Sequence, residues 1–170
     1  MSYILLAPSP EQDPTNEKDT IRMVATLQEI LLAPDSQPKV IDDCFTLIEQ
    51  ELSDQSGVSA AAVKLAYKTV NTFFPGHVRT MIERLLPEMV DNLQPYWAEY
   101  NASGNAKFGD YLAERGGEVS EALLSVTDRH AEASDKPVVV KAYRGVRGSA
   151  AKHIQAALPR VGDLVLKYAN

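Results

Sequence analysis

The densest group of charged side chains with potential chemistry lies near the C-terminus. Arg144, Arg147 and Lys152 surround Ser149 in the stretch RGVRGSAAK. The two glycines predict a turn, followed by a helix that Ser149 caps. A helix N-terminus favours anions, and two arginines and a lysine add charged donors. The stretch therefore predicts a phosphate- or carboxylate-binding site, and the alternative is an ordinary turn with solvated charges.

Residue patterns for catalysis or metal binding are missing from the sequence. His77, His130 and His153 form no i, i+4 pair, and none has a cysteine or a carboxylate pair beside it. A metal site would have to assemble from distant segments. No nucleophile elbow and no nucleotide-binding glycine motif occurs. We therefore expect no catalytic residue, metal or cofactor, although a site assembled in space needs no local motif.

The single cysteine and the acidic pairs also have simple interpretations. Cys44 has no partner for an internal disulfide and lies on the apolar side of an expected helix. We interpret it as a small buried hydrophobic residue, not a reactive thiol. The pairs Asp42–Asp43 and Glu118–Glu121 fall at polar positions, without the apolar pocket that raises the pKa of a general acid.

Aromatic residues concentrate in one part of the chain. Tyr96, Trp97 and Tyr100 are followed soon by Phe108 and Tyr111. One interpretation is packing in the core. The other is contact with a partner or ligand through the first three residues, because Trp and Tyr dominate binding hot spots. The exposure of Trp97 distinguishes the two.

The composition is typical of one folded domain. The chain has 170 residues, 45% of them hydrophobic, and no apolar run is long enough to span a bilayer. A chain of this length buries about two thirds of its unfolded surface, enough for a core without disulfides. The stretch from Met1 to Leu6 is too short for a signal peptide and lacks a basic flank. We expect a cytoplasmic protein with a flexible tail at 1–19 and a helical domain at 20–170.

The net charge of −6 hides an asymmetry. Residues 135–170 hold seven basic and two acidic residues, a net charge of +5, which leaves −11 for residues 1–134. The two parts of one fold would attract each other, or the C-terminal part would bind an anionic partner such as nucleic acid or acidic lipid. We favour attraction within the fold, because the overall charge is wrong for a dedicated nucleic-acid binder.

Hydrophobic residues recur at helical spacing after residue 19, which predicts an all-α fold. The clearest stripe places Ile41, Phe45, Ile48 and Leu52 on one face. Proline, glycine and serine mark where helices begin and end. The first expected helix covers 20–32, with Val24, Leu27 and Leu31 facing inward. The second begins at Ser36 or Pro38 and ends at Ser56, and the third ends at about Phe74. A fourth helix is kinked at Pro87, and short helices follow at about 108–114 and 118–130.

The C-terminal part needs a choice between strand and helix. Residues 138–140 are three valines with strand propensity, but no other β-pattern is present to pair with them. We therefore expect a helix with Pro137 in its first turn, and a last helix that begins near Ser149. The sequence predicts a single-domain bundle of six to eight helices.

Two stretches of the chain resemble each other. VKLAYKTV at 63–70 and VKAYRGV at 140–146 share an Ala-Tyr-basic step. We expect a glycine-containing turn after each, then a helix with a Leu-Pro step, at Leu86–Pro87 and Leu158–Pro159. This echo predicts an internal repeat of two pseudo-symmetric halves that meet at the aromatic cluster. Chance similarity between amphipathic helices is the alternative.

Four motifs carry a resemblance that covers the chain from about Leu27 to Ala169. They are GVSAAAVKLAY, LLPEMVDNLQPYWAEY, FGDYLAER and ALPRVGDLV. In these the chain resembles a family of small helical bacterial proteins, largely actinobacterial, known only as a domain of unknown function. The resemblance implies a small helical fold and implies no activity.

Three hypotheses for function follow. The first is a non-enzymatic binding or protein-interaction module, because helical stripes are abundant and catalytic patterns are missing. The second is a carrier of an apolar small molecule or lipid, in a cavity that Pro87 and Pro159 open between the helical halves. The third is an anionic-surface binder that uses the basic C-terminal segment. The sequence leaves the oligomeric state open.

Overall fold

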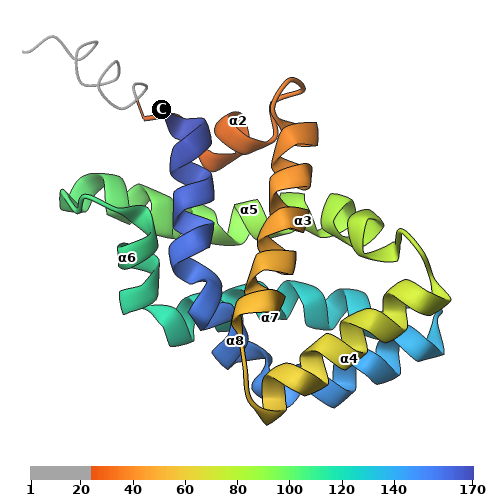
Figure 1. Cartoon of the computed structure of the whole chain (residues 1–170). Helices are drawn as coiled ribbons and strands as arrows, with labels where there is room; N and C mark the ends of the chain where they lie inside the picture. The colour runs from red at the N-terminus through yellow and green to blue at the C-terminus, as the bar shows by residue number, and fades with distance from the viewer. Residues whose placement is uncertain (1–23) are drawn as a thin grey trace, which may run out of the picture.

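Seven helices and no strand make up residues 24–170, the part of the chain that the computed structural model describes (Figure 1). The all-α prediction is confirmed. The expected tail at 1–19 lies outside the described residues. The helices are α2 (Leu27–Leu31), α3 (Gln37–Asp54), α4 (Val58–Phe73), α5 (His77–Ser103), α6 (Phe108–Glu114), α7 (Gly116–Glu132) and α8 (Pro137–Ala169).

Helix α2 begins later than the sequence predicts. Thr26 caps it, because its hydroxyl accepts from the Glu29 N–H and the Glu29 carboxylate accepts from the Thr26 N–H, both at 3.2 Å. Leu27 and Leu31 are buried as expected. Val24 precedes the cap and is 44% exposed, so its predicted place on the inner face is wrong.

The next helices end where the sequence predicts breaks. Helix α3 has Pro38 in its first turn, and α4 follows Gly57, whose φ of 102° is readily adopted only by glycine. Gly76, with φ of 82°, separates α4 from α5. Helix α5 continues through Pro87 and Pro95 and ends at Ser103.

Helix α8 is one continuous helix of 33 residues, so the predicted break near Ser149 is wrong. Gly145 and Gly148 both lie inside it and are exposed. Each glycine costs the helix about 1 kcal/mol relative to alanine. Packing of α8 against α4 and α7 outweighs that cost. The helical prediction for residues 138–140 is confirmed.

The two similar stretches lie on neighbouring helices. The first is in α4 and the second is in the N-terminal half of α8, and the two helices pack side by side (Figure 1). The glycine turn expected after the second stretch is wrong, because α8 continues there. The internal repeat stays a prediction.

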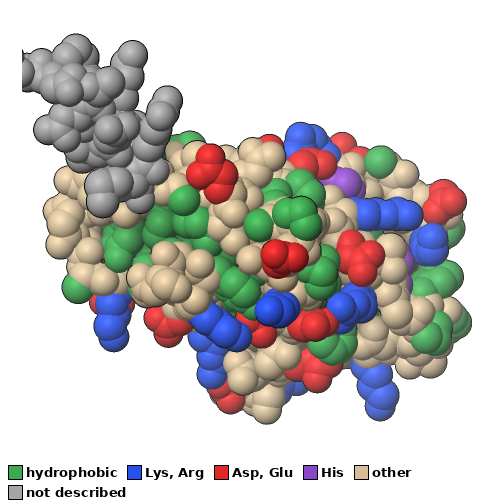
Figure 2. Space-filling view, turned by 90° about the horizontal axis from the view of Figure 1, so that it is seen from above, with side chains coloured by type: hydrophobic (Ala, Val, Ile, Leu, Met, Phe, Trp, Pro, Cys, Tyr) green, Lys and Arg blue, Asp and Glu red, His purple; other side chains and the backbone are tan. Residues whose placement is uncertain are grey.

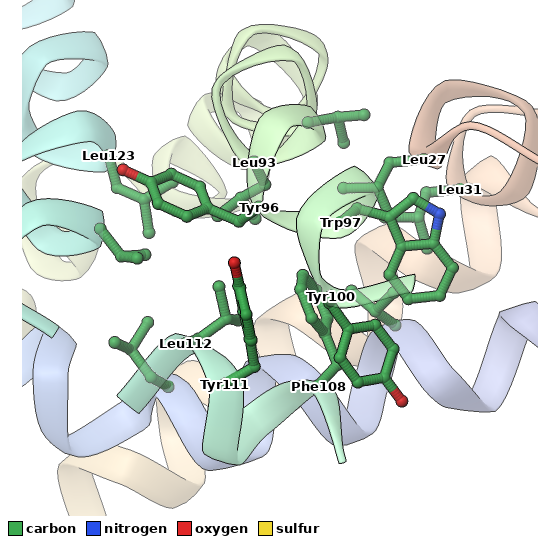
Figure 3. Packing of buried hydrophobic residues seen from close by; sticks show 14 of the residues in the cluster. Leu27, Leu31, Leu93, Tyr96, Trp97, Tyr100, Phe108, Tyr111, Leu112 and Leu123 are labelled. Atoms are coloured by element: carbon green, nitrogen blue, oxygen red, sulfur yellow. The ribbon is translucent and has the colours of Figure 1, made fainter. Parts of the chain in front are cut away.

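The core is continuous from the aromatic cluster to the aliphatic stripes (Figure 3). Trp97 packs edge-on against Phe108 with ring centroids 5.1 Å apart, and Tyr100 lies 5.1 Å from the same ring. Tyr111 adds a further edge contact with Tyr100 at 6.0 Å. These rings join α5 to α6, and Leu158 and Val165 bring α8 into the same cluster.

The backbones of α6 and α8 touch at two glycines. A Cβ added to Gly162 would lie 2.0 Å from the Gly109 nitrogen, and one added to Gly109 would lie 2.7 Å from the Pro159 carbonyl oxygen. Backbone atoms cannot move aside as side chains can. Both positions therefore require glycine for the helices to cross this closely.

We expect Gly162→Ala to lower the free energy of unfolding by about 3 kcal/mol or more, because the added methyl group meets backbone. Gly148→Ala is the matched control, since nothing lies within 4 Å of a Cβ there. It should raise stability by about 0.5–1 kcal/mol through helix propensity. Urea unfolding followed by circular dichroism measures both. Equal effects of the two substitutions would contradict the close crossing.

Candidate functional site: an apolar cavity between α3, α5, α7 and α8

A cavity of about 320 Å³ lies between α3, α5, α7 and α8, and Leu31 of α2 adds to its wall. Three of its wall residues, Leu31, Leu93 and Leu123, are labelled in Figure 3. The space is thus beside the aromatic cluster and is part of the same core. Its other lining residues are Val40, Cys44, Leu47, Ile48, Ile82, Leu85, Leu86, Met89, Val90, Thr127, Val161, Leu164 and Val165.

The cavity has a deep side and a side close to the surface. Val40, Val90 and Val165 are buried, whereas Leu47 and Leu164 are half-buried. Leu47 and Leu164 also line a neighbouring surface hollow. The cavity therefore approaches solvent between α3 and α8.

The wall contains only two polar side chains, and neither carries charge. The Thr127 hydroxyl lies 3.0 Å from the Leu124 carbonyl oxygen and 2.7 Å from the Tyr143 hydroxyl. Burial, and to a smaller extent the charge of Asp43, raises the pKa of the Cys44 thiol to about 11. Cys44 is therefore protonated at neutral pH, which agrees with its predicted inert role. Such a wall suits an uncharged apolar group.

Charged residues line the hollow next to the cavity, and most of them are paired between α3 and α8. The Asp43 carboxylate accepts from Lys167 at 2.7 Å and from the Tyr168 hydroxyl at 2.5 Å, and these bonds lower the pKa of Asp43. Arg160 donates to Glu51 at 2.9 Å and also pairs with Asp54. These pairs confirm the expected attraction between the basic C-terminal segment and acidic residues elsewhere in the fold.

A second charged cluster joins α7 to α8. Arg147 donates to Asp128 at 2.8 Å, and the Tyr143 hydroxyl donates to the same carboxylate at 2.5 Å. The bond from Arg147, and then that from Tyr143, holds the pKa of Asp128 below its usual value. Burial and the Asp128 charge raise the pKa of Tyr143 to about 12. The Tyr143 hydroxyl is also hydrogen-bonded to Thr127, which lines the cavity. This cluster therefore supports one wall of the cavity.

The predicted anion site lacks the helix N-terminus on which it depended. Ser149 lies inside α8 and its hydroxyl donates to the Val146 carbonyl at 3.2 Å, so its predicted capping role is wrong. Arg147 is bound to Asp128. Arg144 and Lys152 are exposed on α8. Anion binding by these residues stays a prediction, without the cap.

The aromatic residues proposed as a contact site are buried. Tyr96, Trp97 and Tyr100 are 9%, 5% and 8% exposed, as the packing interpretation requires. The Trp97 ring N–H donates to the Ala25 carbonyl at 2.9 Å. The Tyr96 hydroxyl bonds Glu118 at 3.1 Å. These three side chains stabilise the core and do not line the cavity.

Within residues 24–170, no group of three His, Cys, Asp or Glu side chains is placed to hold a metal ion. His130 Nε2 lies 2.9 Å from a carboxylate oxygen of Glu88, and His153 Nδ1 is hydrogen-bonded to the side-chain oxygen of Gln55. None of the helices α2–α8 combines the length and apolar character needed to cross a bilayer.

The sequence predicted a cavity between the helical halves at Pro87 and Pro159, and neither proline lines the cavity of the structure. Leu31 and Ile48 were expected to face inward, and both line the cavity. An inward stripe does not show whether the stripes of facing helices meet or leave a space. The two half-buried leucines at the cavity's outer side, Leu47 and Leu164, lay outside the predicted stripes.

The family of the chain is also clear. Residues 27–169 match a family described as "Family of unknown function (DUF6918)". The chain belongs to this family. The match spans α2 to α8, so the cavity and the Gly109–Gly162 contact both lie within the DUF6918 region. Searches of curated proteins and of solved structures found no significant match. The bacterial origin implied by the resemblance stays a prediction.

The Asp128 cluster generates a pH prediction. A carboxylate with a lowered pKa stabilises the fold above its unfolded pKa, and this stabilisation is lost as the pH falls through its folded pKa. Between about pH 5 and pH 2, the unfolding free energy should fall less in Asp128→Asn than in the natural chain. Urea midpoints across this range measure the difference. Asp91→Asn, at an exposed position, is the control, and identical pH dependence in all three chains would contradict the account.

Proposed function

We propose that the protein binds an apolar small molecule, or the apolar tail of a lipid, in the cavity between α3, α5, α7 and α8. The observation that supports this function is the cavity itself, about 320 Å³ in volume and lined almost entirely by aliphatic side chains. Ligand sites commonly have volumes of about 300–1,000 Å³ and mostly apolar walls. The volume suits a small hydrophobic compound or a short chain.

Packing energetics support an occupant. Protein interiors are normally close-packed, with few voids larger than a water molecule. An apolar cavity that holds no ligand lowers stability, because its lining side chains lose packing contacts. A hydrophobic ligand restores those contacts. Water does so poorly, because Thr127 already has partners within the protein and the wall offers few other polar atoms.

The chemistry of the wall favours binding over catalysis. Cys44 is the one cavity residue with nucleophilic potential, and a thiol with a pKa of about 11 stays protonated at neutral pH. A ligand with a polar end would place it toward the hollow lined by Asp43, Arg160 and Lys167. A cytoplasmic location belongs to the same proposal, since a single cysteine suits a reducing compartment.

The first test compares two identical substitutions. Val161→Phe adds a ring to the cavity wall, and Val58→Phe adds the same ring at a position that is 90% exposed. N-phenyl-1-naphthylamine, a neutral fluorophore, is titrated into each chain. We expect Val161→Phe to weaken its binding at least about tenfold by filling the space, with Val58→Phe unchanged. Circular dichroism and urea unfolding check that both variants fold.

Cys44 gives an independent readout, because it is the only cysteine and it lines the cavity. Iodoacetamide at about pH 9, where part of a thiol with a pKa of about 11 is ionised, should modify it more slowly when the fluorophore is bound, as followed by mass spectrometry. The protection should disappear in Val161→Phe. Fluorophore binding that leaves the Cys44 rate unchanged, or that is equal in both valine variants, would place the ligand elsewhere and sink the proposal.

A further inference from the structure

Helix α4 presents an apolar face to solvent. Val58, Leu65 and Phe73 are 90%, 66% and 63% exposed. Their spacing of seven and eight residues places them along one side of the helix, over about 22 Å. Ala61 and Ala62 are exposed between them. A stripe of this kind on a 16-residue helix is more typical of an interaction surface than of an isolated surface residue.

A groove of about 420 Å³ runs beside this stripe, between α4 and the N-terminal half of α8. Small residues form much of the groove, so few side chains project into it. They are Ala62 and Ala66 of α4, with Ala142 and Gly145 of α8. Leu65 and Val146 add larger apolar walls. We call the stripe and groove together the α4–α8 face.

The two helical segments that form the α4–α8 face carry only basic charged residues. No acidic residue occurs from Gln55 to Ile82 or from Lys136 to Gly162. Lys68 on α4, with Lys141 and Arg144 on α8, is exposed and forms no ion pair within the described residues. Acidic residues approach from neighbouring segments: Glu49 of α3, Glu121 and Asp128 of α7, which pair with Arg147, and Glu132 and Asp135 beside the start of α8. On the face seen from above, the space-filling view shows charges of both signs among apolar side chains (Figure 2).

We propose that the α4–α8 face docks an acidic amphipathic helix of another protein. A helix lays its apolar ridge into a groove between two helices, and small groove residues permit close approach. Acidic residues beside that ridge would meet Lys68 on one side and Lys141 and Arg144 on the other. The proposal is independent of the ligand cavity, because the two share no lining residue.

Two other occupants agree less well with this face. A second copy would place the same cations opposite one another across a two-fold interface, which is repulsive. A membrane surface favours a helix rich in large apolar side chains, but α4 exposes only Val58, Leu65 and Phe73 of that kind, among Ala61, Ala62, Lys64, Lys68 and Thr72. Shape and charge together favour a partner helix.

The experiment uses the full chain and a fluorescein-labelled synthetic helix of about 16 residues, matched to the length of α4. The peptide has a leucine and alanine stripe with glutamates on both flanks. Fluorescence anisotropy should show binding that weakens as salt rises. Leu65→Glu and Arg144→Glu should each weaken it at least about tenfold, whereas Lys107→Glu, in the loop before α6, should not. A peptide with lysines in place of the glutamates should not bind.

Leu65 and Arg144 are exposed, so both variants should keep the circular dichroism spectrum of the natural chain. The proposal is overturned if the acidic peptide does not bind, or if Leu65→Glu binds it unchanged. It is also overturned if phosphatidylserine vesicles, and not the peptide, bind in a Leu65-dependent way. Dimerisation in sedimentation that Leu65→Glu abolishes would likewise assign the face to a second copy.

Discussion

The fold depends on one contact, the backbone crossing of α6 and α8 at Gly109 and Gly162. It brings two helices so close that neither position has room for a Cβ atom. Helix α8 then packs against α2, α3, α4, α6 and α7, so its position sets much of the remaining architecture. Phe108 precedes Gly109 and closes the aromatic cluster with Trp97 and Tyr100. A steric constraint at two glycines thus determines where the largest side chains of the core can meet.

The same turn of α8 connects this contact with the cavity. Val161 and Val165 lie one residue before and three residues after Gly162, and both line the cavity. On the neighbouring helices, Cys44, Met89 and Leu123 complete a wall without charge. The charged groups of this region lie outside the wall, where Asp43 and Lys167 pair across α3 and α8. The arrangement separates an apolar interior from a polar entrance, which is the property that the proposed binding function requires.

Local signals in the sequence predicted most helix boundaries, because capping, proline and left-handed glycine act within a few residues. The expected helix at 108–114 and the start at Pro137 agree with the structure. The break near Ser149 was wrong because packing along α8 outweighs the cost of Gly145 and Gly148, and the anion-site prediction lost its cap for the same reason. Gly162 looked like any helical glycine, since its role depends on Gly109, more than fifty residues earlier in the chain. The sequence hypothesis of a cavity at Pro87 and Pro159 did not give its position, because that position depends on where side chains of α3, α5, α7 and α8 leave a space.

The central claim is that the interior of this DUF6918 protein accepts an apolar guest. Xenon enters apolar cavities without needing any polar contact, so methyl NMR under xenon pressure tests the claim most directly. The account predicts saturable shifts at the methyl groups of Met89, Leu123 and Val165, and their loss in Val161→Phe. Small shifts that rise without saturation and are spread evenly over all methyl groups would contradict it.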